Sequence, residues 1–166
     1  KVDWTVACVV CLETRHVVAF ERSHGLPWHE QRRRIKALCD AYDGARAVVD
    51  ATGVGDPNVE ELIRDGVRVS PFVFTGPSKR DLIETLIVTI EQRRVTFPRI
   101  EALIAELEVF EYEQRPSGLL SYNAPDGYHD DCVMALALAC DGLPEVNAPA
   151  VAASAVRVGR AAGRGF

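Results

Sequence analysis

Three aspartates stand where the sequence could perform acid-dependent chemistry. Asp130 and Asp131 are adjacent in "YHDDCVMALALAC", just where an apolar helical pattern begins, and Asp50 ends the apolar run "ARAVVD". Adjacent carboxylates repel each other, and each resists losing its water. The simplest interpretation makes Asp130 a helix N-cap, a common place for a single Asp, and Asp131 an exposed acid. Two acids together with a strand-end acid are more than capping requires.

Divalent cations would relieve this repulsion. Carboxylate oxygens and water are the ligands that Mg²⁺ prefers. Two such ions, about 3.5–4 Å apart, can clamp the attacking water and the leaving oxygen of a phosphodiester. Neighbouring helical positions diverge by roughly 100°, so Asp130 and Asp131 cannot both face one ion squarely. We therefore predict that one of them binds an ion directly, while the other serves a second ion or a bound water.

The elements that must position these acids alternate between strands and helices. The apolar spacing predicts, in order, hairpin strands 4–11 and 16–22, helix 29–42, strand 45–50, helix 58–65 stopped by Gly66, strand 67–74 interrupted by Pro71, helix 78–93 with Ser78 and Asp81 as its capping box, short strand 95–97, helix 100–107, hairpin 109–122 turning at 116–118, and helix 129–141. A hairpin that leads into βαβ units predicts an α/β fold with a mixed β-sheet and helices on both faces. Ligands gather at the carboxyl ends of strands in such sheets, and Asp50 stands at one of these ends.

Length and composition indicate one domain. The chain has 166 residues, 48% of them hydrophobic and 26% charged, which suffices for one globular core. We assign residues 1–144 to this domain and expect residues 145–166, rich in Ala, Gly and Val, to form a flexible C-terminal tail. The sequence has no apolar run of the roughly 18 residues that a membrane span needs. Five cysteines without framework spacing suit a reducing cytoplasm.

Charge limits how this domain could contact nucleic acid. Residues 1–145 hold 16 of the 19 basic side chains and all 24 acidic ones, a net charge of −8. Free-standing DNA-binding modules are usually basic, so DNA binding here would require local basic patches, metal ions or another domain. The run "HEQRRRIK" does not supply a patch, because consecutive helical residues cannot share one face. We expect it to be a solvated helix surface.

Four segments, in this order, resemble a known family: "VVDATGVGDPNVEEL", "FTGPSKRDLIETL", "VTFP" and "YHDDCVMALALA". They are similar to the nuclease domain of the large terminase subunit of tailed double-stranded DNA bacteriophages, over nearly the whole chain to about Cys140. The resemblance implies an RNase H-like fold, here with the late β-hairpin added. It also implies a metal-dependent endonuclease, with Mg²⁺ or Mn²⁺ and two ions expected, that cuts concatemeric phage DNA during genome packaging by two-metal-ion phosphodiester hydrolysis.

The resemblance also implies which residues bind metal. Asp50 corresponds to the family's strand-end acid, and Asp130 and Asp131 to its acidic pair, so all three are expected to be catalytic metal ligands. The family's first strand carries an Asp a few residues before a D-x-T element. The D-x-T element is present here as Asp3–Thr5, but the position of the earlier Asp precedes Lys1. Asp3 is therefore the one first-strand acid in view, and we keep it as a catalytic candidate beside the alternative of an ordinary solvated acid.

Three further residues are DNA-binding candidates. Lys79 and Arg80 stand at the start of a helix, where phosphates bind readily. His129 could orient a water or contact a phosphate, although a capping or solvent-facing role fits it equally. The implied partners are double-stranded DNA, an upstream ATPase domain of the same full-length chain, and the portal and small terminase subunits, in the host cytoplasm and without a membrane.

Two alternatives remain open. A nuclease of the same fold could act as a junction resolvase or in the manner of a transposase, on branched DNA or on DNA ends. A catalytically idle RNase H-like module could bind DNA or a partner without cutting. The set of Asp50, Asp130 and Asp131 argues against the idle module. An Mn²⁺-dependent nicking assay would separate it from the nucleases.

Overall fold

The computed structural model describes residues 4–52, 57–114, 120–123, 125 and 128–143. Its elements are, in chain order, β1 (Trp4–Val10), β2 (Val17–His24), α1 (Trp28–Ala41), β3 (Ala47–Asp50), α2 (Pro57–Arg64), β4 (Val69–Phe72), α3 (Gly76–Glu91), α4 (Glu101–Val109), β5 (Glu111–Gln114), β6 (Leu120–Asn123) and α5 (Asp131–Cys140). This order matches the predicted order except at residues 95–97, where a single bridge between His16 and Thr96 replaces the expected strand.

The strands form three hydrogen-bonded pairs. β1 and β2 are antiparallel, with an irregularity between Val9 and Val10, and β5 and β6 form the late antiparallel hairpin. β3 and β4 are parallel, with Asp50 opposite Phe72 at their carboxyl ends. Parallel and antiparallel pairs thus occur together, as a mixed α/β fold requires. The described backbone has no ladder between β1 and β3, and a cleft lies between these two strands.

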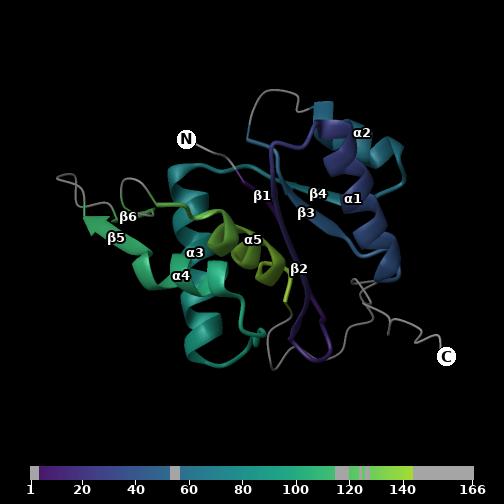
Figure 1. Cartoon of the computed structure of the whole chain (residues 1–166). Helices are drawn as coiled ribbons and strands as arrows, with labels where there is room; N and C mark the ends of the chain where they lie inside the picture. Colours follow the sequence, from purple (N-terminus) through teal and green to yellow (C-terminus); the bar gives the residue numbers. More distant parts are fainter. Residues whose placement is uncertain (1–3, 53–56, 115–119, 124, 126–127, 144–166) are drawn as a thin grey trace.

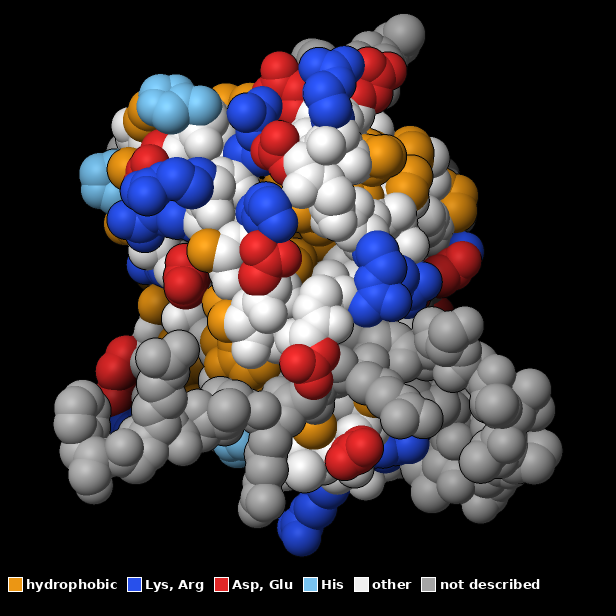
Figure 2. Space-filling view, turned by 90° about the vertical axis from the view of Figure 1, so that its right-hand side faces the viewer, with side chains coloured by type: hydrophobic (Ala, Val, Ile, Leu, Met, Phe, Trp, Pro, Cys, Tyr) orange, Lys and Arg blue, Asp and Glu red, His pale blue; other side chains and the backbone are white. Residues whose placement is uncertain are grey.

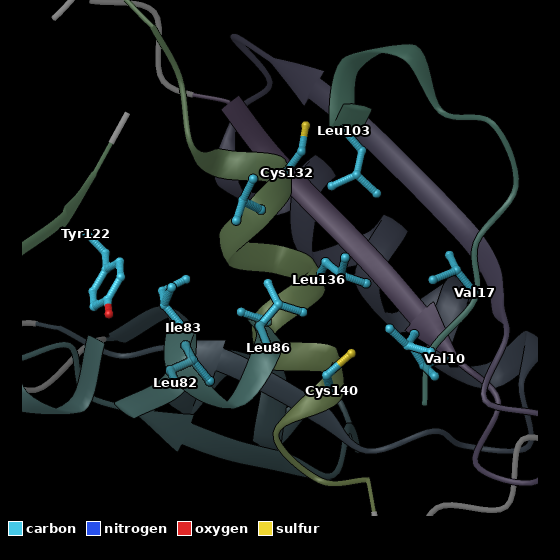
Figure 3. Packing of buried hydrophobic residues seen from close by; sticks show 13 residues of the cluster. Val10, Val17, Leu82, Ile83, Leu86, Leu103, Tyr122, Cys132, Leu136 and Cys140 are labelled. Carbon is cyan, nitrogen blue, oxygen red and sulfur yellow. The ribbon is translucent and has the colours of Figure 1, made fainter. Parts of the chain in front are cut away.

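Helices cover both sides of the strands (Figure 1), as the sequence predicts. On one side α1 and α2 pack on β3 and β4 around Cys39, Leu62 and Val67. On the other side lies the larger core, which surrounds α5 (Figure 3). Its buried side chains come from β1, α3, α4, α5 and neighbouring segments, and those labelled in the figure are Val10, Val17, Leu82, Ile83, Leu86, Leu103, Tyr122, Cys132, Leu136 and Cys140.

Helix α5 is at the centre of the larger core because its sequence is apolar on nearly every side. Cys132, Val133, Leu136 and Ala137 are all 1% exposed or less. A helix that is apolar all round must be surrounded by other elements, and here β1, α3 and α4 surround it. The first residue of α5, Asp131, is therefore held against Trp4 at the start of β1 by an extensively buried helix.

The start of α3 corrects the predicted capping box. The helix begins at Gly76, two residues earlier than expected, with Pro77 in its first turn and Thr75 as its N-cap. The Thr75 hydroxyl accepts the Ser78 N–H at 3.1 Å, and the Ser78 hydroxyl accepts the Thr75 N–H at 2.8 Å. Ser78 thus completes a box with Thr75 and not with Asp81. Proline fits the first turn because its missing N–H would have no helical partner there.

Two further local predictions can be compared with the structure. Gly66 ends α2 as predicted: its φ is +87°, and its N–H donates to the Ile63 carbonyl at 2.9 Å. This left-handed conformation is typical of a helix C-terminus that ends at glycine. Pro71, in contrast, does not interrupt its strand, since it lies within β4 opposite Val49. In the described part of the chain β4 pairs only with β3, and an edge strand tolerates proline.

The basic run on α1 is ion-paired, in agreement with the predicted solvated surface. Arg33 pairs with Glu30, and Lys36 pairs with Asp40, in each case within one turn of the helix. Arg32 bridges to Glu61 and Asp65 on or just beyond α2. Figure 2 shows basic and acidic side chains interspersed on this face of the molecule, so α1 presents no continuous basic surface. None of the described helices has the length and apolar character needed to cross a bilayer.

The predicted turn at 116–118 and the predicted tail at 145–166 lie outside the described residues. Deleting residues 145–166 should leave the melting temperature within about 2 °C of the full chain, because their composition offers little pattern for a core. Differential scanning calorimetry of both proteins under identical conditions measures this difference. A drop of 5 °C or more, by the same scaling, would show that these residues pack against the domain.

Candidate metal centre

Four of the predicted site residues line one cleft. Asp50 comes from the end of β3, Lys79 from the first turns of α3, and Asp130 and Asp131 from the start of α5. The cleft has a volume of about 1020 Å³, and its walls are formed largely by β1, β3, α1 and α5. Residues far apart in sequence thus line one cleft, and Asp50 stands at the carboxyl end of β3, the edge that the strand order predicts for a ligand.

Asp50 is exposed and held by the turn that follows it. Its carboxylate accepts the Thr52 backbone N–H at 2.8 Å, and the Thr52 hydroxyl accepts the Phe74 N–H at 2.8 Å. These two bonds connect the chain leaving β3 to the chain leaving β4. Asp50 is therefore fixed at the edge of the strand pair with part of its carboxylate still exposed to the cleft.

Asp130 occupies the N-cap position of α5 but does not cap the helix. Its side chain makes no capping hydrogen bond. Instead, its Oδ2 lies 3.0 Å from the Lys79 Nζ, and the two side chains are about a quarter exposed, at 23% and 26%. The simple interpretation of Asp130 as a helix cap is therefore wrong. Its carboxylate faces a cation at the edge of the cleft, although the cation is an ammonium group from another helix.

Asp131 lies in a less favourable environment for its charge. Burial raises the pKa of its carboxyl group, and the negative charges of Glu106 and Asp130 raise this pKa further. His129, whose Nδ1 lies 3.4 Å from Oδ2, and the backbone N–H of Trp4 oppose the rise in pKa. The net direction is upward, which means that the folded protein holds this carboxylate at a cost when the site contains no metal ion.

The raised pKa of Asp131 predicts a pH-dependent effect of Asp131→Asn. Above the folded-state pKa the wild-type carboxylate destabilises the fold, and as the pH falls through this pKa protonation removes the cost. The metal-free variant should therefore melt at a higher temperature than wild type at pH 7–8, and the difference should shrink as the pH falls toward about 4. Paired melting curves in EDTA across this range measure it. A difference that grows on acidification would contradict the assigned direction.

Sequence reasoning missed one acid near the site, Glu106 on α4. It is 6% exposed, and its Oε2 accepts the backbone N–H groups of Cys132 and Val133 at 2.6 and 3.3 Å. The burial of Glu106 could have been predicted from the sequence, because Glu106 follows the apolar residue Leu103 by three positions. An acid at that spacing lies on the apolar face of the helix, and a buried acid needs a partner.

The donor set fits a hard divalent cation. Asp50, Asp130 and Asp131 offer carboxylate oxygens, the ligands that Mg²⁺ and Mn²⁺ prefer, and the Lys79 ammonium shows that a positive charge is accommodated beside Asp130. Among the described residues no three His, Cys, Asp or Glu side chains converge closely enough to hold an ion by themselves. The remaining predicted acid, Asp3, lies outside the described residues.

The predicted DNA-binding residues have different surroundings. Lys79 lines the cleft. The Arg80 guanidinium Nε lies 3.4 Å from an Asp81 carboxylate oxygen and 4.0 Å from one of Glu84, both on the same helix. His129 is partly buried beside Asp131, where it contributes positive potential only when protonated. The structure thus brings Lys79 and His129 to the acids, and Arg80 to the adjoining outer surface of α3.

The fold, with its strand-end acid and helix-start acids in one cleft, is that of the RNase H-like class of nuclease domains. A family model described as the terminase RNaseH-like domain matches residues 1–141. The chain therefore belongs to the terminase RNaseH-like domain family.

Individual relatives agree with this assignment. The chain is 38% identical over 138 residues to the large terminase subunit of Thermus virus P23-45, covering 82% of this chain and 28% of that protein. It is also similar to crystal structures of the large terminase nuclease from thermophilic phage G20c. The cobalt-bound form has a TM-score of 0.80 at 36% identity, and the magnesium-bound form 0.80 at 35%. Both matches cover 86% of this chain and 76% of the crystallised chain.

Proposed function

We propose that this chain is the part of a phage large terminase that cuts concatemeric DNA during genome packaging. It would act as a metal-dependent endonuclease that hydrolyses a phosphodiester bond. The observation that carries the proposal is the Lys79–Asp130 ion pair, 3.0 Å long, in a cleft that Asp50 and Asp131 also line. The Asp130 side chain makes no capping hydrogen bond and pairs with a cation instead. Such a carboxylate is suited to binding a metal ion. The relatives crystallised with magnesium and cobalt support this reading.

Asp50, Asp130 and Asp131 would hold two Mg²⁺ or Mn²⁺ ions, and Asp3 stays a further catalytic candidate. When bound, such ions supply an activated water and stabilise the charge that develops on the phosphate. The protein's own contribution is orientation. The Thr52 N–H fixes the Asp50 carboxylate from one side, and the buried α5 holds the backbone of Asp130 and Asp131 on the other.

Lys79 would serve the DNA once an ion has replaced it at Asp130. Its ammonium lies at the edge of the cleft, where it would contact a phosphate of the bound DNA, since phosphates bind readily at helix starts. His129 and Arg80 would add contacts to the flanking phosphates. Because residues 1–145 carry a net charge of −8, an upstream ATPase domain, with the portal and small terminase subunits in the host cytoplasm, would bring the double-stranded DNA to this cleft.

Plasmid nicking tests the proposed activity. The chain should convert supercoiled DNA to nicked and linear forms with Mn²⁺ or Mg²⁺, and EDTA should abolish cleavage because the acids alone cannot stabilise the charge on the phosphate. Ca²⁺ at the same ionic strength is the control for non-specific charge effects. Cleavage that persists in EDTA would contradict the proposal. A strong preference for a four-way junction over linear duplex would indicate a resolvase-type nuclease instead.

A further inference from the structure

The first turn of α5 is capped by a residue from another helix. The first N–H groups of a helix have no partner within the helix and are usually satisfied by the side chain of the N-cap residue. The Asp130 side chain makes no such bond. The carboxylate of Glu106, 26 positions earlier on α4, accepts the N–H groups of Cys132 and Val133 instead.

We infer that Glu106 is a positioning residue, whose buried carboxylate caps α5 and so leaves the Asp130 and Asp131 side chains to bind metal. This inference rests on the proposed function, because it assigns Glu106 a role toward the same site. Asp130 is a good N-cap residue by type. If no other group satisfied these N–H groups, the Asp130 carboxylate would be drawn onto the helix end and away from Lys79 and the cleft.

A local network holds the Glu106 carboxylate in place. Its Oε1 makes no hydrogen bond within the described part of the chain, and it lies 3.5 Å from the Nη2 of Arg22 on β2. The Arg22 guanidinium in turn stacks on the Trp4 ring of β1, 3.8 Å from its centroid. These contacts connect β1, β2, α4 and α5, and the backbone of Trp4 also contacts Asp131. The network therefore fixes α5 against the start of β1, the strand that continues from Asp3.

Burying the Glu106 carboxylate at the start of α5 costs free energy. This cost indicates that the carboxylate does more than satisfy the first N–H groups of the helix. A buried carboxylate must give up its water, and Glu106 lies close enough to Asp131 for the two negative charges to oppose each other. A local Ser or Thr cap would satisfy the same N–H groups without adding a charge. What the distant cap provides is an N-terminal turn in which the two consecutive acids need not bond to their own helix.

Matched variants on α4 test the inference in the full 166-residue chain. Glu106→Ala removes the cap, whereas Glu106→Gln keeps an acceptor oxygen in nearly the same place. Glu108→Ala is the control, since Glu108 is exposed on the same helix. The first measurement is amide hydrogen exchange at Cys132 and Val133 by NMR in EDTA. The second is Mn²⁺ affinity by isothermal titration calorimetry, and neither measurement depends on cleavage.

In Glu106→Ala, hydrogen exchange at the two amides should be about tenfold faster than in wild type. Mn²⁺ binding should be about 10- to 100-fold weaker, the usual range for residues that orient metal ligands. Glu106→Gln should stay within about threefold of wild type on both measurements because the cap remains. If Glu106→Ala does not fold, Glu106→Asp takes its place, because retracting the carboxylate by one methylene should produce the same two changes.

Three outcomes overturn the inference. One is Mn²⁺ affinity equal in Glu106→Ala and Glu108→Ala despite a lower melting temperature, which would make Glu106 merely structural. The second is unchanged exchange at Cys132 and Val133 in Glu106→Ala, which would show that another group caps α5. The third is Glu106→Gln that weakens Mn²⁺ binding as much as Glu106→Ala, which would make the charge, and not the cap, responsible. A wild-type chain that binds no Mn²⁺ would instead contradict the proposed function, and the exchange data would still report on the cap.

Discussion

Replacing Asp130 with Asn should lower the rate of DNA cleavage by about a hundredfold to a thousandfold, the loss typical when one group that stabilises transition-state charge is removed. Asn keeps the shape of the side chain but has no negative charge to hold a divalent ion. The carboxylate of Asp130 faces the cleft and a cation, so its charge is the property that the proposed metal site would use.

The stability of Asp130→Asn should remain within about 0.5 kcal/mol of wild type. Two effects of the substitution oppose each other in the metal-free protein. Removing the charge relieves repulsion with Asp131, whose pKa the Asp130 charge helps to raise. It also removes the partly exposed ion pair with Lys79, and such pairs contribute at most about 1 kcal/mol. Because Glu106 caps α5, the helix end is unaffected.

Single-turnover nicking with saturating Mn²⁺ and chemical denaturation in EDTA measure these two quantities. Asp141→Asn is the matched control, since Asp141 is exposed at the opposite end of the same helix. It should cleave at the wild-type rate. Asp130→Asn with full activity would mean that Asp130 is not a ligand, whatever its effect on stability.

The elements of the fold could be predicted because their signals are local. The apolar stripes, Gly66 and the strand that ends at Asp50 specified helices and strands to within a few residues. The prediction that Asp50 and Asp130 share one site assumed that a strand end and a helix start meet at one edge of the sheet. Both residues line the same cleft, and their common role stays a prediction. The errors were also local. Helix α3 begins two residues earlier than expected, at Gly76 with Pro77 in its first turn, so its capping box joins Thr75 to Ser78 and not Ser78 to Asp81.

The details of the candidate site could not be predicted, because they depend on contacts distant in sequence. Lys79 and Asp130 are 51 positions apart, and Glu106 and Cys132 are 26 apart. N-cap rules consider only the residues at the helix end, so they assign the cap to Asp130. They cannot show that another helix provides it. The gap in hydrogen bonding between β1 and β3 is likewise invisible to periodicity, which reports what each strand buries and not which strand lies beside it.

Replacing Lys79 with Gln should change three quantities, and not all in the same direction. Without metal, Asp130 loses its counter-ion beside Asp131, so the protein should be less stable by about 1 kcal/mol, the upper value for a partly exposed ion pair. With metal, no ammonium has to be displaced from Asp130. The same 1 kcal/mol should therefore appear as Mn²⁺ binding about fivefold tighter than in wild type. Cleavage at saturating Mn²⁺ should nevertheless fall about tenfold or more, because the proposed charge-assisted contact of Lys79 to the phosphate would be lost.

Denaturation in EDTA, Mn²⁺ calorimetry and nicking with saturating Mn²⁺ measure these quantities on the same preparations. Lys36→Gln is the control, since Lys36 also pairs with an aspartate, Asp40, but on the exposed face of α1. It should change neither Mn²⁺ affinity nor cleavage. If Lys79 serves only to hold α3 against α5, then Lys79→Gln should lose stability and weaken Mn²⁺ binding together, because a displaced Asp130 binds the ion less well. Tighter Mn²⁺ binding combined with slower cleavage arises only if the ammonium and the metal ion compete for Asp130 and the ammonium then acts on the DNA.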